Sequence, residues 1–242
     1  RDLHERSRRQ SQMCIRDSCN ILSNRKPIII KVPGVIKLCF QIQQQLQLIT
    51  RHADGVALLL IRLYLAPVMV QAGWQKLANF DSTVQWFGDA EFGLGLPFPY
   101  VLAMLASLAE FVGGLLLVPG LAVRWVSIPL LITMVVAMVT VHAENGWLAI
   151  ADANSWLADG TLLTNPSVME APEKLAAAKS LLEEHGYIEW LTSSGNFVIL
   201  NNGIEFAATY FVMLLVLLCF GAGRYTSIDY YLSQYIARRC GL

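Results

Sequence analysis

The fold is decided by the stretch YVLAMLASLAEFVGGLLLVPGLAVRWVSIPLLITMVVAMVTVHA, Tyr100–Ala143. It contains two long apolar runs separated only by Pro119 and Gly120, a pair of residues typical of a tight turn. Each run has about the length of roughly 20 apolar residues that a helix needs to cross a bilayer. The stretch therefore predicts two antiparallel membrane-spanning helices joined by a short turn.

The composition of the whole chain is that of a membrane protein. Of its 242 residues, 55% are hydrophobic and 15% are charged, and the mean hydropathy is +0.48. Soluble domains carry about a quarter charged residues. The net charge of zero and the lack of a basic stripe argue against a nucleic-acid partner. The five cysteines show no CxxC spacing, so a Cys-ligated zinc or iron–sulfur site has no support in the sequence.

Two further apolar runs complete the predicted fold. The four expected spans are Val56–Ala78, Tyr100–Val118, Leu121–Ala143 and Gly203–Ala222. We expect an all-α integral membrane four-helix bundle, preceded by an N-terminal amphipathic helix at the membrane interface. A long outer loop is expected to carry a short helix, Pro172–His185, because proline opens that segment and glycine follows it.

The remaining segments are divided by their composition. Residues 1–20 lack apolar periodicity and are expected to be a non-native or disordered leader. Residues 21–54 are expected to form a cytoplasmic amphipathic segment. The membrane domain is expected at 55–224, with its outer loop at 144–202, and a cytoplasmic tail at 225–242.

The distribution of lysine and arginine predicts the orientation. Basic residues gather before the first span, after the fourth, and at Arg124 beyond the short turn. The loops 79–99 and 144–202 are acidic instead. Since basic loops stay in the cytoplasm, both termini are expected there, in the cytoplasmic (inner) membrane of a bacterium.

Ionisable side chains within the spans are the candidate functional residues, because a charge inside a bilayer is costly and turns toward the bundle interior. The positions of Arg62 and Glu110 in their spans place both side chains at similar depths in the membrane, close enough to form an ion pair. At the outer end, His142 closes the third span and Glu205 opens the fourth. These four residues form the candidate proton or charge site. The alternatives are a buried pair that fixes helix register and polar residues that cap helix ends.

Three polar or aromatic residues in the outer half of the first span form a candidate ligand-binding group. They are Gln71, Trp74 and Lys76, whose depth in the membrane matches that of His142. Such side chains can donate hydrogen bonds to a ligand in an apolar slot.

A possible metal path follows the third span. Met134, Met138 and His142 recur at four-residue steps, which places two thioethers and an imidazole along one helical face. Thioether and imidazole ligands suit Cu(I), so a copper path is one interpretation. Methionines in an apolar bundle also serve as packing residues, which is the alternative. His142 is the lone histidine in the predicted spans, which excludes a bis-histidine haem.

Several long blocks carry a family resemblance. They read LLLIRLYLAPVMVQAGWQKL, GLPFPYVLAMLASLAEFVGGLLLVPGLAVRW and NNGIEFAATYFVMLLVLLCFGAGRYTSIDYYL. These blocks resemble the DoxX family over about Ala53–Leu232, and the four candidate charge-site residues match polar positions within them. The loop sequences VHAENGWLAIADANSWLADG and LTSSGNFVILNNGIEF are similar to the branch found beside copper-binding, bufferin-type modified-peptide clusters.

The resemblance implies a four-helix membrane bundle and two main functions. The first is a redox-linked, quinone-interacting membrane subunit or partner of an oxidoreductase. The second is an accessory protein for the maturation, export or copper loading of a copper-binding modified peptide. An ion-coupled transporter is a third alternative, although the chain lacks inverted repeats. Quinone and copper are the cofactors that these functions imply, and a homo-oligomer and direct catalysis are left open.

Overall fold

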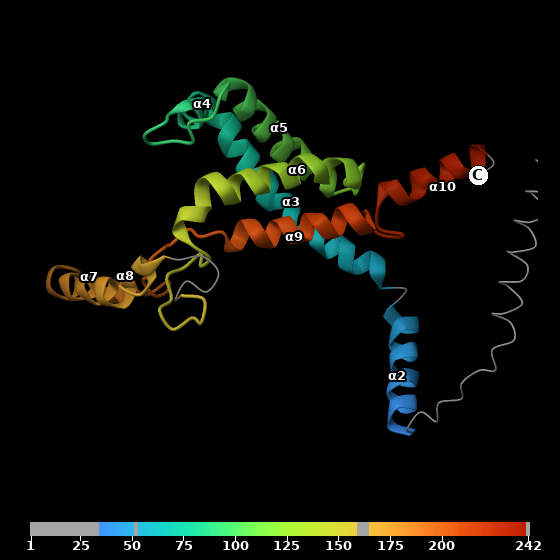
Figure 1. The fold of residues 1–242 in the computed structure, drawn as a ribbon, viewed down its shortest axis with the longest axis horizontal. Coiled ribbons are helices and arrows are strands. Elements are labelled where there is room, and N and C mark those ends of the chain that lie inside the picture. The colour runs from blue at the N-terminus through green and yellow to red at the C-terminus, as the bar shows by residue number, and fades with distance from the viewer. Residues whose placement is uncertain (1–33, 51–52, 159–164, 241–242) are drawn as a thin grey trace, which may run out of the picture. The chain divides into compact units, whose positions relative to one another are not determined.

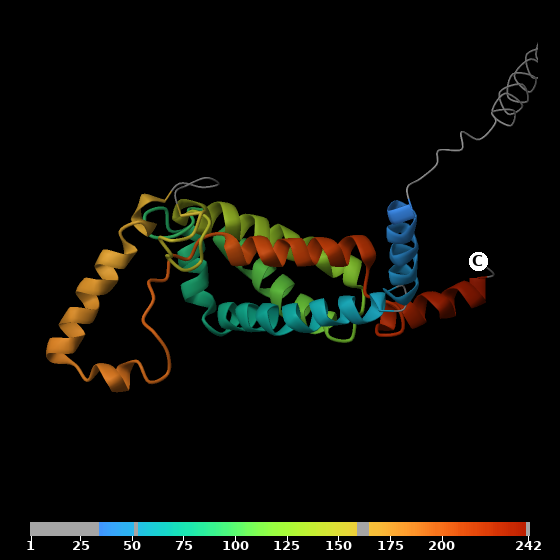
Figure 2. The ribbon, with the colours of Figure 1, turned by 90° about the horizontal axis from the view of Figure 1, so that it is seen from below.

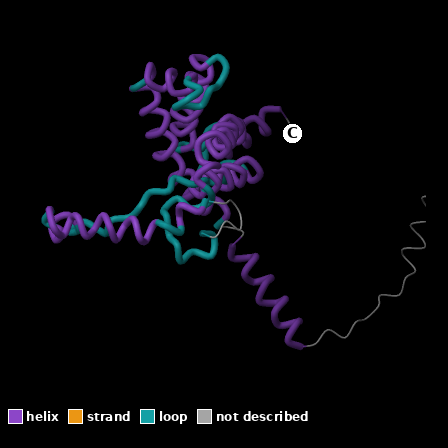
Figure 3. Tube along the Cα trace, turned by 60° about the vertical axis from the view of Figure 1, so that its left-hand side comes forward, coloured by secondary structure: helices purple, strands orange, loops and turns teal. Residues whose placement is uncertain are grey.

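The computed structural model describes residues 34–50, 53–158 and 165–240, and this part of the chain is built from helices and loops (Figures 1 and 3). Two loop segments meet at an isolated antiparallel β-bridge between Ile150 and Leu200. By contact density the chain divides into two compact units, Arg1–Thr50 and Arg51–Leu242. The leader predicted for residues 1–20 lies outside the described residues.

In the first unit, the described residues form one helix, α2, Gly34–Thr50. It lies within the segment 21–54 for which the sequence predicts an amphipathic helix. Its apolar side chains, including Val35, Leu38 and Leu46, are exposed. The position of this helix on a membrane surface stays a prediction.

Three helices of the second unit are long and apolar enough to cross a membrane. They correspond to α3, Asp54–Ala78, to α5, Pro99–Leu117, and to α6, Val123–Ala137, which continues through a π-helical turn, Met138–His142. The first three predicted spans are therefore confirmed as helices of membrane-crossing length. The fourth coincides with α9, Glu205–Phe220, an apolar helix of 16 residues whose crossing of the membrane stays a prediction.

The four apolar helices pack against one another in pairs. α3 lies along α5, α5 contacts α6, α6 lies along α9, and α9 also touches α3 (Figures 1 and 2). Their contacts bury a core of aliphatic side chains that includes Leu65, Met69, Leu117, Leu130 and Leu214. We call the end with the α5–α6 connection the turn end, and the opposite end, with the loops 79–98 and 146–204, the loop end.

Shorter helices lie outside this core. α4, Phe80–Gly88, follows α3, and α7, Ala171–His185, and α8, Ile188–Leu191, lie beyond the loop end (Figure 1). α10, Ile228–Cys240, follows α9. α7 coincides with the helix predicted at Pro172–His185, apart from its first residue. The helices α4, α8 and α10 were not predicted from the sequence, because none of them is a long apolar run.

The turn that follows α4 is held by the carboxylate of Asp89. It accepts the backbone N–H of Glu91 at 2.8 Å and that of Phe92 at 3.1 Å. The N–H groups of Phe92 and Glu91 lower the pKa of Asp89 below its ordinary value, because they stabilise the charged form.

Glycines allow the backbones of α3 and α5 to approach closely. A Cβ on Gly73 would clash with the backbone of Phe111, and a Cβ on Gly114 would lie 2.8 Å from the backbone nitrogen of Val70. Small residues at a helix contact are typical of membrane bundles, in which close van der Waals packing holds helices together. The register of α5 on α3 therefore depends on these two glycines.

Substituting Gly114→Ala should destabilise the protein, because the added methyl group meets backbone atoms of α3 that cannot move aside. Overpacking of this kind costs about 1–3 kcal/mol. Thermal unfolding of the detergent-solubilised protein measures the effect. Gly34→Ala is the control, since nothing lies within 4 Å of a Cβ there. An unfolding temperature for Gly114→Ala equal to that of the control would show that the close approach is absent.

Candidate functional site

A buried ion pair joins α3 to α5 toward the loop end. The Nζ atom of Lys76 lies 2.5 Å from the Oε2 atom of Glu110. The side chain of Glu110 is 6% exposed and that of Lys76 is 27% exposed. The carboxylate is therefore enclosed, whereas the ammonium group keeps partial access to the surroundings.

This pair differs from the expected one, because Arg62 is not the partner of Glu110. In an α-helix each Cα–Cβ bond tilts toward the helix N-terminus. α3 begins at the turn end and α5 begins at the loop end, so Lys76 and Glu110 lean toward each other. Arg62 is also on α3 and also leans toward the turn end, and therefore away from Glu110, which lies nearer the loop end. The expected Arg62–Glu110 pair is therefore wrong, because depth along the sequence alone does not include this tilt.

Arg62 instead binds backbone carbonyls at the turn end. Its Nη1 atom donates to the carbonyl oxygens of Leu117 and Val118 at 3.1 and 3.2 Å, and its Nη2 atom donates to that of Thr226 at 2.8 Å. The residue is fully buried, and its Nε–H finds no acceptor among the described residues. Arg62 thus ties α3 to the end of α5 and to the segment before α10.

A carboxylate completes this junction. Both oxygens of Asp229 accept backbone N–H groups, one from Ala122 at 2.6 Å and one from Val123 at 2.9 Å. These donors stand at the start of α6, where a negative charge is favoured by the helix dipole. This role of Asp229 leaves no local pattern in the sequence, because the carboxylate and the N–H groups that it accepts are more than a hundred residues apart in the chain.

The expected ligand-binding residues do not gather around one point. Lys76 is engaged by Glu110, while Trp74 lies against Phe111 with ring centroids 5.8 Å apart. Trp74 and Gln71 are exposed on α3. Of the three, Lys76 alone is placed by an ionic contact within the helix packing.

His142 and Glu205 lie at the loop end, as expected, and each binds loop backbone. The Nδ1 atom of His142 lies 2.8 Å from the carbonyl oxygen of Asn202, which can only accept, so Nδ1 carries the proton. The Oε2 atom of Glu205 accepts the N–H of Ala149 at 3.0 Å. Both residues anchor the long loop to the helices. Neither shares a hydrogen bond or ion pair with Lys76 or Glu110 within the described part.

Asparagines form the rest of this anchor, which we call the asparagine clasp: Asn145, Asn165 and Asn201. Asn165 donates to the carbonyl of Asn145 and to the side chain of Asn201, both at 3.0 Å. Asn201 donates to the carbonyls of Asn145 and Leu148 at 2.6 and 2.7 Å. The clasp closes the beginning of the long loop on its end. Asn201 is the first residue of the NNG sequence before α9. This NNG sequence is the local feature from which the clasp could have been predicted.

The predicted copper path meets a change in helix geometry. Met134 is buried in α6, whereas Met138 and His142 begin and end the π-helical turn, in which hydrogen bonds span five residues. The four-residue step that predicts one α-helical face therefore applies only up to Met138. No group of three or more His, Cys, Asp or Glu side chains suited to a metal occurs in the described ranges. The copper path of Met134, Met138 and His142 stays a hypothesis.

The Lys76–Glu110 pair has the chemistry of a proton and hydrogen-bond site. Lys76 carries three N–H donors, of which Glu110 uses one, so donors remain for a ligand carbonyl. The carboxylate can take up a proton when the ammonium group is drawn away. This pair is therefore the best candidate for chemistry between the helices.

The helices that hold this pair also carry the match to known proteins. Residues 57–143 match the DoxX family. The DoxX segment contains most of α3, all of α5 and α6, and both members of the Lys76–Glu110 pair, and it ends just after His142. Together with the three membrane-length helices, it identifies a multi-pass membrane protein. No curated protein and no solved structure matches the chain.

Breaking the ion pair from either side should destabilise the protein unequally. Lys76→Met leaves an enclosed carboxylate without its partner, and the loss of a partner from a buried pair costs roughly 3–5 kcal/mol. Glu110→Gln should cost less, because the ammonium group can turn outward. The double variant should be more stable than Lys76→Met. Thermal unfolding in detergent measures all three.

The control for these three variants is Lys174→Met, which breaks an exposed ion pair between Lys174 of α7 and Glu170 just before that helix, with an N–O distance of 2.7 Å. Exposed pairs contribute about 0–1 kcal/mol, so this variant should unfold close to the wild type. A Lys76→Met protein as stable as Lys174→Met would contradict the burial of the pair.

Proposed function

We propose that the chain forms a four-helix bundle that crosses the bacterial cytoplasmic membrane four times, with α9 as the fourth span. The apolar character of α9 and its packing on α6 and α3 support this proposal. Its 16 residues extend about 24 Å, somewhat less than the roughly 30 Å of a hydrocarbon core. Local thinning of the bilayer would accommodate the difference. The membrane domain 55–224 then has its long loop 144–202 outside and its tail 225–242 inside.

The same proposal places both termini in the cytoplasm. Its support is the basic charge around the turn end and the acidic charge of the loops at the loop end. The exposed apolar side chains of α2 fit an amphipathic helix at the membrane interface. A reporter fused to the C-terminus that is active only in the cytoplasm checks this orientation.

The function that the geometry supports best is that of a redox-linked membrane subunit that interacts with a quinone. The observation that carries it is the enclosed Lys76–Glu110 pair between two spans. A quinone is an apolar ring with two carbonyl acceptors, and it needs a hydrogen-bond donor within the hydrocarbon layer. Lys76 can donate to one carbonyl, and its partial exposure gives a lipid-soluble ligand a route to it.

The reduction of a quinone to a quinol takes two electrons and two protons. In this proposal the electrons come from a partner oxidoreductase. The pair delivers one proton to the quinone oxygen that Lys76 binds, and the other oxygen takes its proton from water or from the partner. Lys76 gives up its proton, and Glu110 takes up and passes on the replacement. The partner enzyme, rather than this chain, carries out the oxidation of the electron donor.

Quinone retention tests this function. The wild-type protein, purified in a mild detergent, should retain membrane quinone that organic extraction and absorbance spectroscopy detect. Glu110→Gln and Lys76→Met should each reduce the quinone per protein by about tenfold, the effect of one lost hydrogen bond to a charged group. The control Glu173→Gln changes an exposed carboxylate of α7. Absence of quinone from the wild type, or equal retention in all variants, would refute the proposal.

A second function, as an accessory protein for a copper-binding modified peptide, is favoured by the surface of the long loop. Leu181 lies on α7, Trp190 lies on α8, and Tyr187 lies on the connection between them. Each of these side chains is at least 60% exposed. Exposed aromatic residues are typical of protein-binding surfaces. The asparagine clasp holds the base of this loop on the helices.

Replacing Ala171–Leu191 with a Gly/Ser linker discriminates between the two functions. The clasp residues stay in place, so the bundle should fold. The accessory function predicts that peptide maturation and copper tolerance fail in this variant, whereas the redox function predicts that both are unchanged. Quinone retention should be unchanged in either case, because the Lys76–Glu110 pair lies between α3 and α5. Substituting Met134 and Met138 together by Leu tests the copper path separately. Unchanged copper binding in that variant would remove it.

A further inference from the structure

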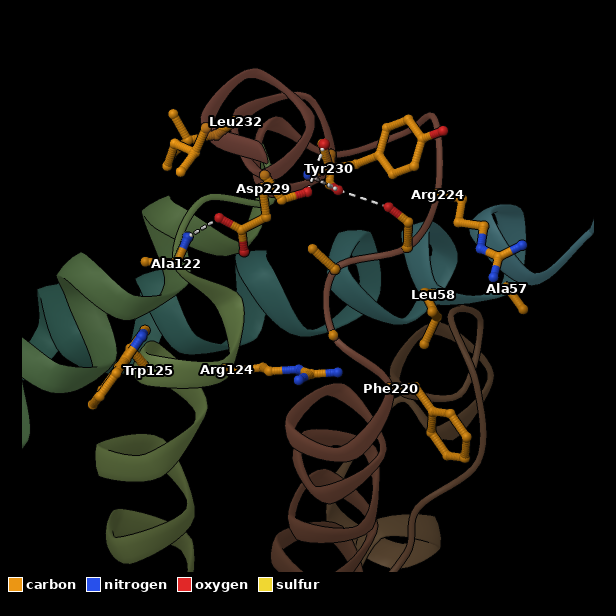
Figure 4. A pocket seen from close by; sticks show the side chains of 16 residues that line it. Ala57, Leu58, Ala122, Arg124, Trp125, Phe220, Arg224, Asp229, Tyr230 and Leu232 are labelled. Atoms are coloured by element: carbon orange, nitrogen blue, oxygen red, sulfur yellow. Dashed lines mark hydrogen bonds between the residues drawn. The ribbon is translucent and has the colours of Figure 1, made fainter. Parts of the chain in front are cut away.

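The turn end holds a pocket that the proposed redox chemistry does not use. Its volume is about 860 Å³, and four segments line it: the start of α3, the start of α6, the chain after α9, and α10 (Figure 4). The junction made by Arg62 and Asp229 fixes these segments relative to one another. The pocket is therefore built by helix ends that the tertiary structure holds in place.

Two arginines supply the charge of this pocket. Arg124 extends from α6 toward the end of α9, where its Nη2 atom donates to the carbonyl oxygen of Cys219 at 3.2 Å (Figure 4). Arg224 lies in the loop before α10 and makes no hydrogen bond or ion pair with the described residues. Both are exposed, and each presents N–H donors that no described acceptor occupies.

The lining also contains one acid, Asp229, whose two oxygens are already bound to backbone N–H groups of α6. Two cations against one engaged carboxylate leave the pocket with an excess of positive charge. Glycine at position 221 leaves room for the guanidinium group of Arg124, because a Cβ there would lie 3.3 Å from its Nε atom. A guanidinium group favours a phosphate, which accepts paired N–H donors.

The rim of the pocket is apolar, which distinguishes a lipid from a soluble phosphate. Trp125 and Phe220 are 78% and 72% exposed, and tryptophan is enriched at the level of lipid headgroups. On α10, Ile228, Leu232 and Ile236 recur at four-residue steps and are exposed. This pattern fits a helix that lies in the membrane interface. A phosphate bound between the arginines would place acyl chains along this rim.

We infer that the turn-end pocket binds the phosphate group of an anionic phospholipid through Arg124 and Arg224. The inference requires that α3, α5 and α6 span the membrane, and it is independent of the quinone proposal. A bound lipid would hold the start of α6 and the start of α10 at the membrane surface.

Native mass spectrometry of the full-length protein in detergent tests this site. Phosphatidylglycerol should remain bound more tightly than phosphatidylcholine with the same acyl chains. The double variant Arg124→Gln/Arg224→Gln should lose about tenfold in affinity for phosphatidylglycerol, the effect of two partly exposed charge contacts. The control variant Arg238→Gln/Arg239→Gln removes two charges of α10 outside the pocket and should bind as the wild type does. Equal binding of the two lipids, or full retention by the double variant, would overturn the inference.

Inorganic phosphate distinguishes the two sources of the phosphate group. For a lipid site, millimolar phosphate should leave phosphatidylglycerol bound. Displacement of the lipid by phosphate, with the same dependence on the arginines, would overturn the assignment to a lipid. The single variant Arg224→Gln separates a loss of lipid binding from a loss of folding, since Arg224 makes no hydrogen bond or ion pair with the described residues. It should reduce lipid binding with an unchanged unfolding temperature, and undiminished binding in this variant would count against the site.

Discussion

The structure depends on one buried cation, Arg62. The carbonyls at the end of an α-helix lack partners within the helix and carry partial negative charge. Arg62 satisfies two of them at the end of α5, and a third carbonyl, that of Thr226, before α10. Gly120 must be glycine there, because a Cβ would collide with the guanidinium group and the backbone φ is +70°. The α5–α6 turn and the chain after α9 are thus positioned by one side chain of α3.

Polar groups of the helix bundle are arranged at successive levels, and each level has its own task. At the turn end, Arg62 and Asp229 satisfy helix termini. Between α3 and α5, the pair of Lys76 and Glu110 neutralises itself. At the loop end, the asparagine clasp binds loop backbone. Since Arg62, Asp229 and the clasp are engaged in holding the chain together, Lys76 is the residue among these three groups whose donors are free to meet a ligand.

Much of the helix architecture could be predicted from the sequence, because long apolar runs reflect the cost of exposing backbone to lipid. Three membrane-length helices and α7 lie where the sequence predicts them. The candidate site was predicted only in part. Glu110, Lys76, His142 and Glu205 were selected because they are ionisable or polar residues in apolar surroundings. Their hydrogen-bond and ionic partners could not be predicted, because neither the tilt of side chains along a helix nor the fold of the long loop leaves a pattern in the local sequence.

By itself, the sequence determined that the chain is helical, that it belongs in a membrane, and which few charges must find partners there. These properties follow from hydropathy and helix length, which act residue by residue. Tertiary structure alone decided that Glu110 pairs with Lys76 and that Arg62 binds carbonyls at the turn end. It also decided that two distant arginines face one pocket. Pairing depends on where helices cross and which way side chains tilt, and both arise only when the helices pack.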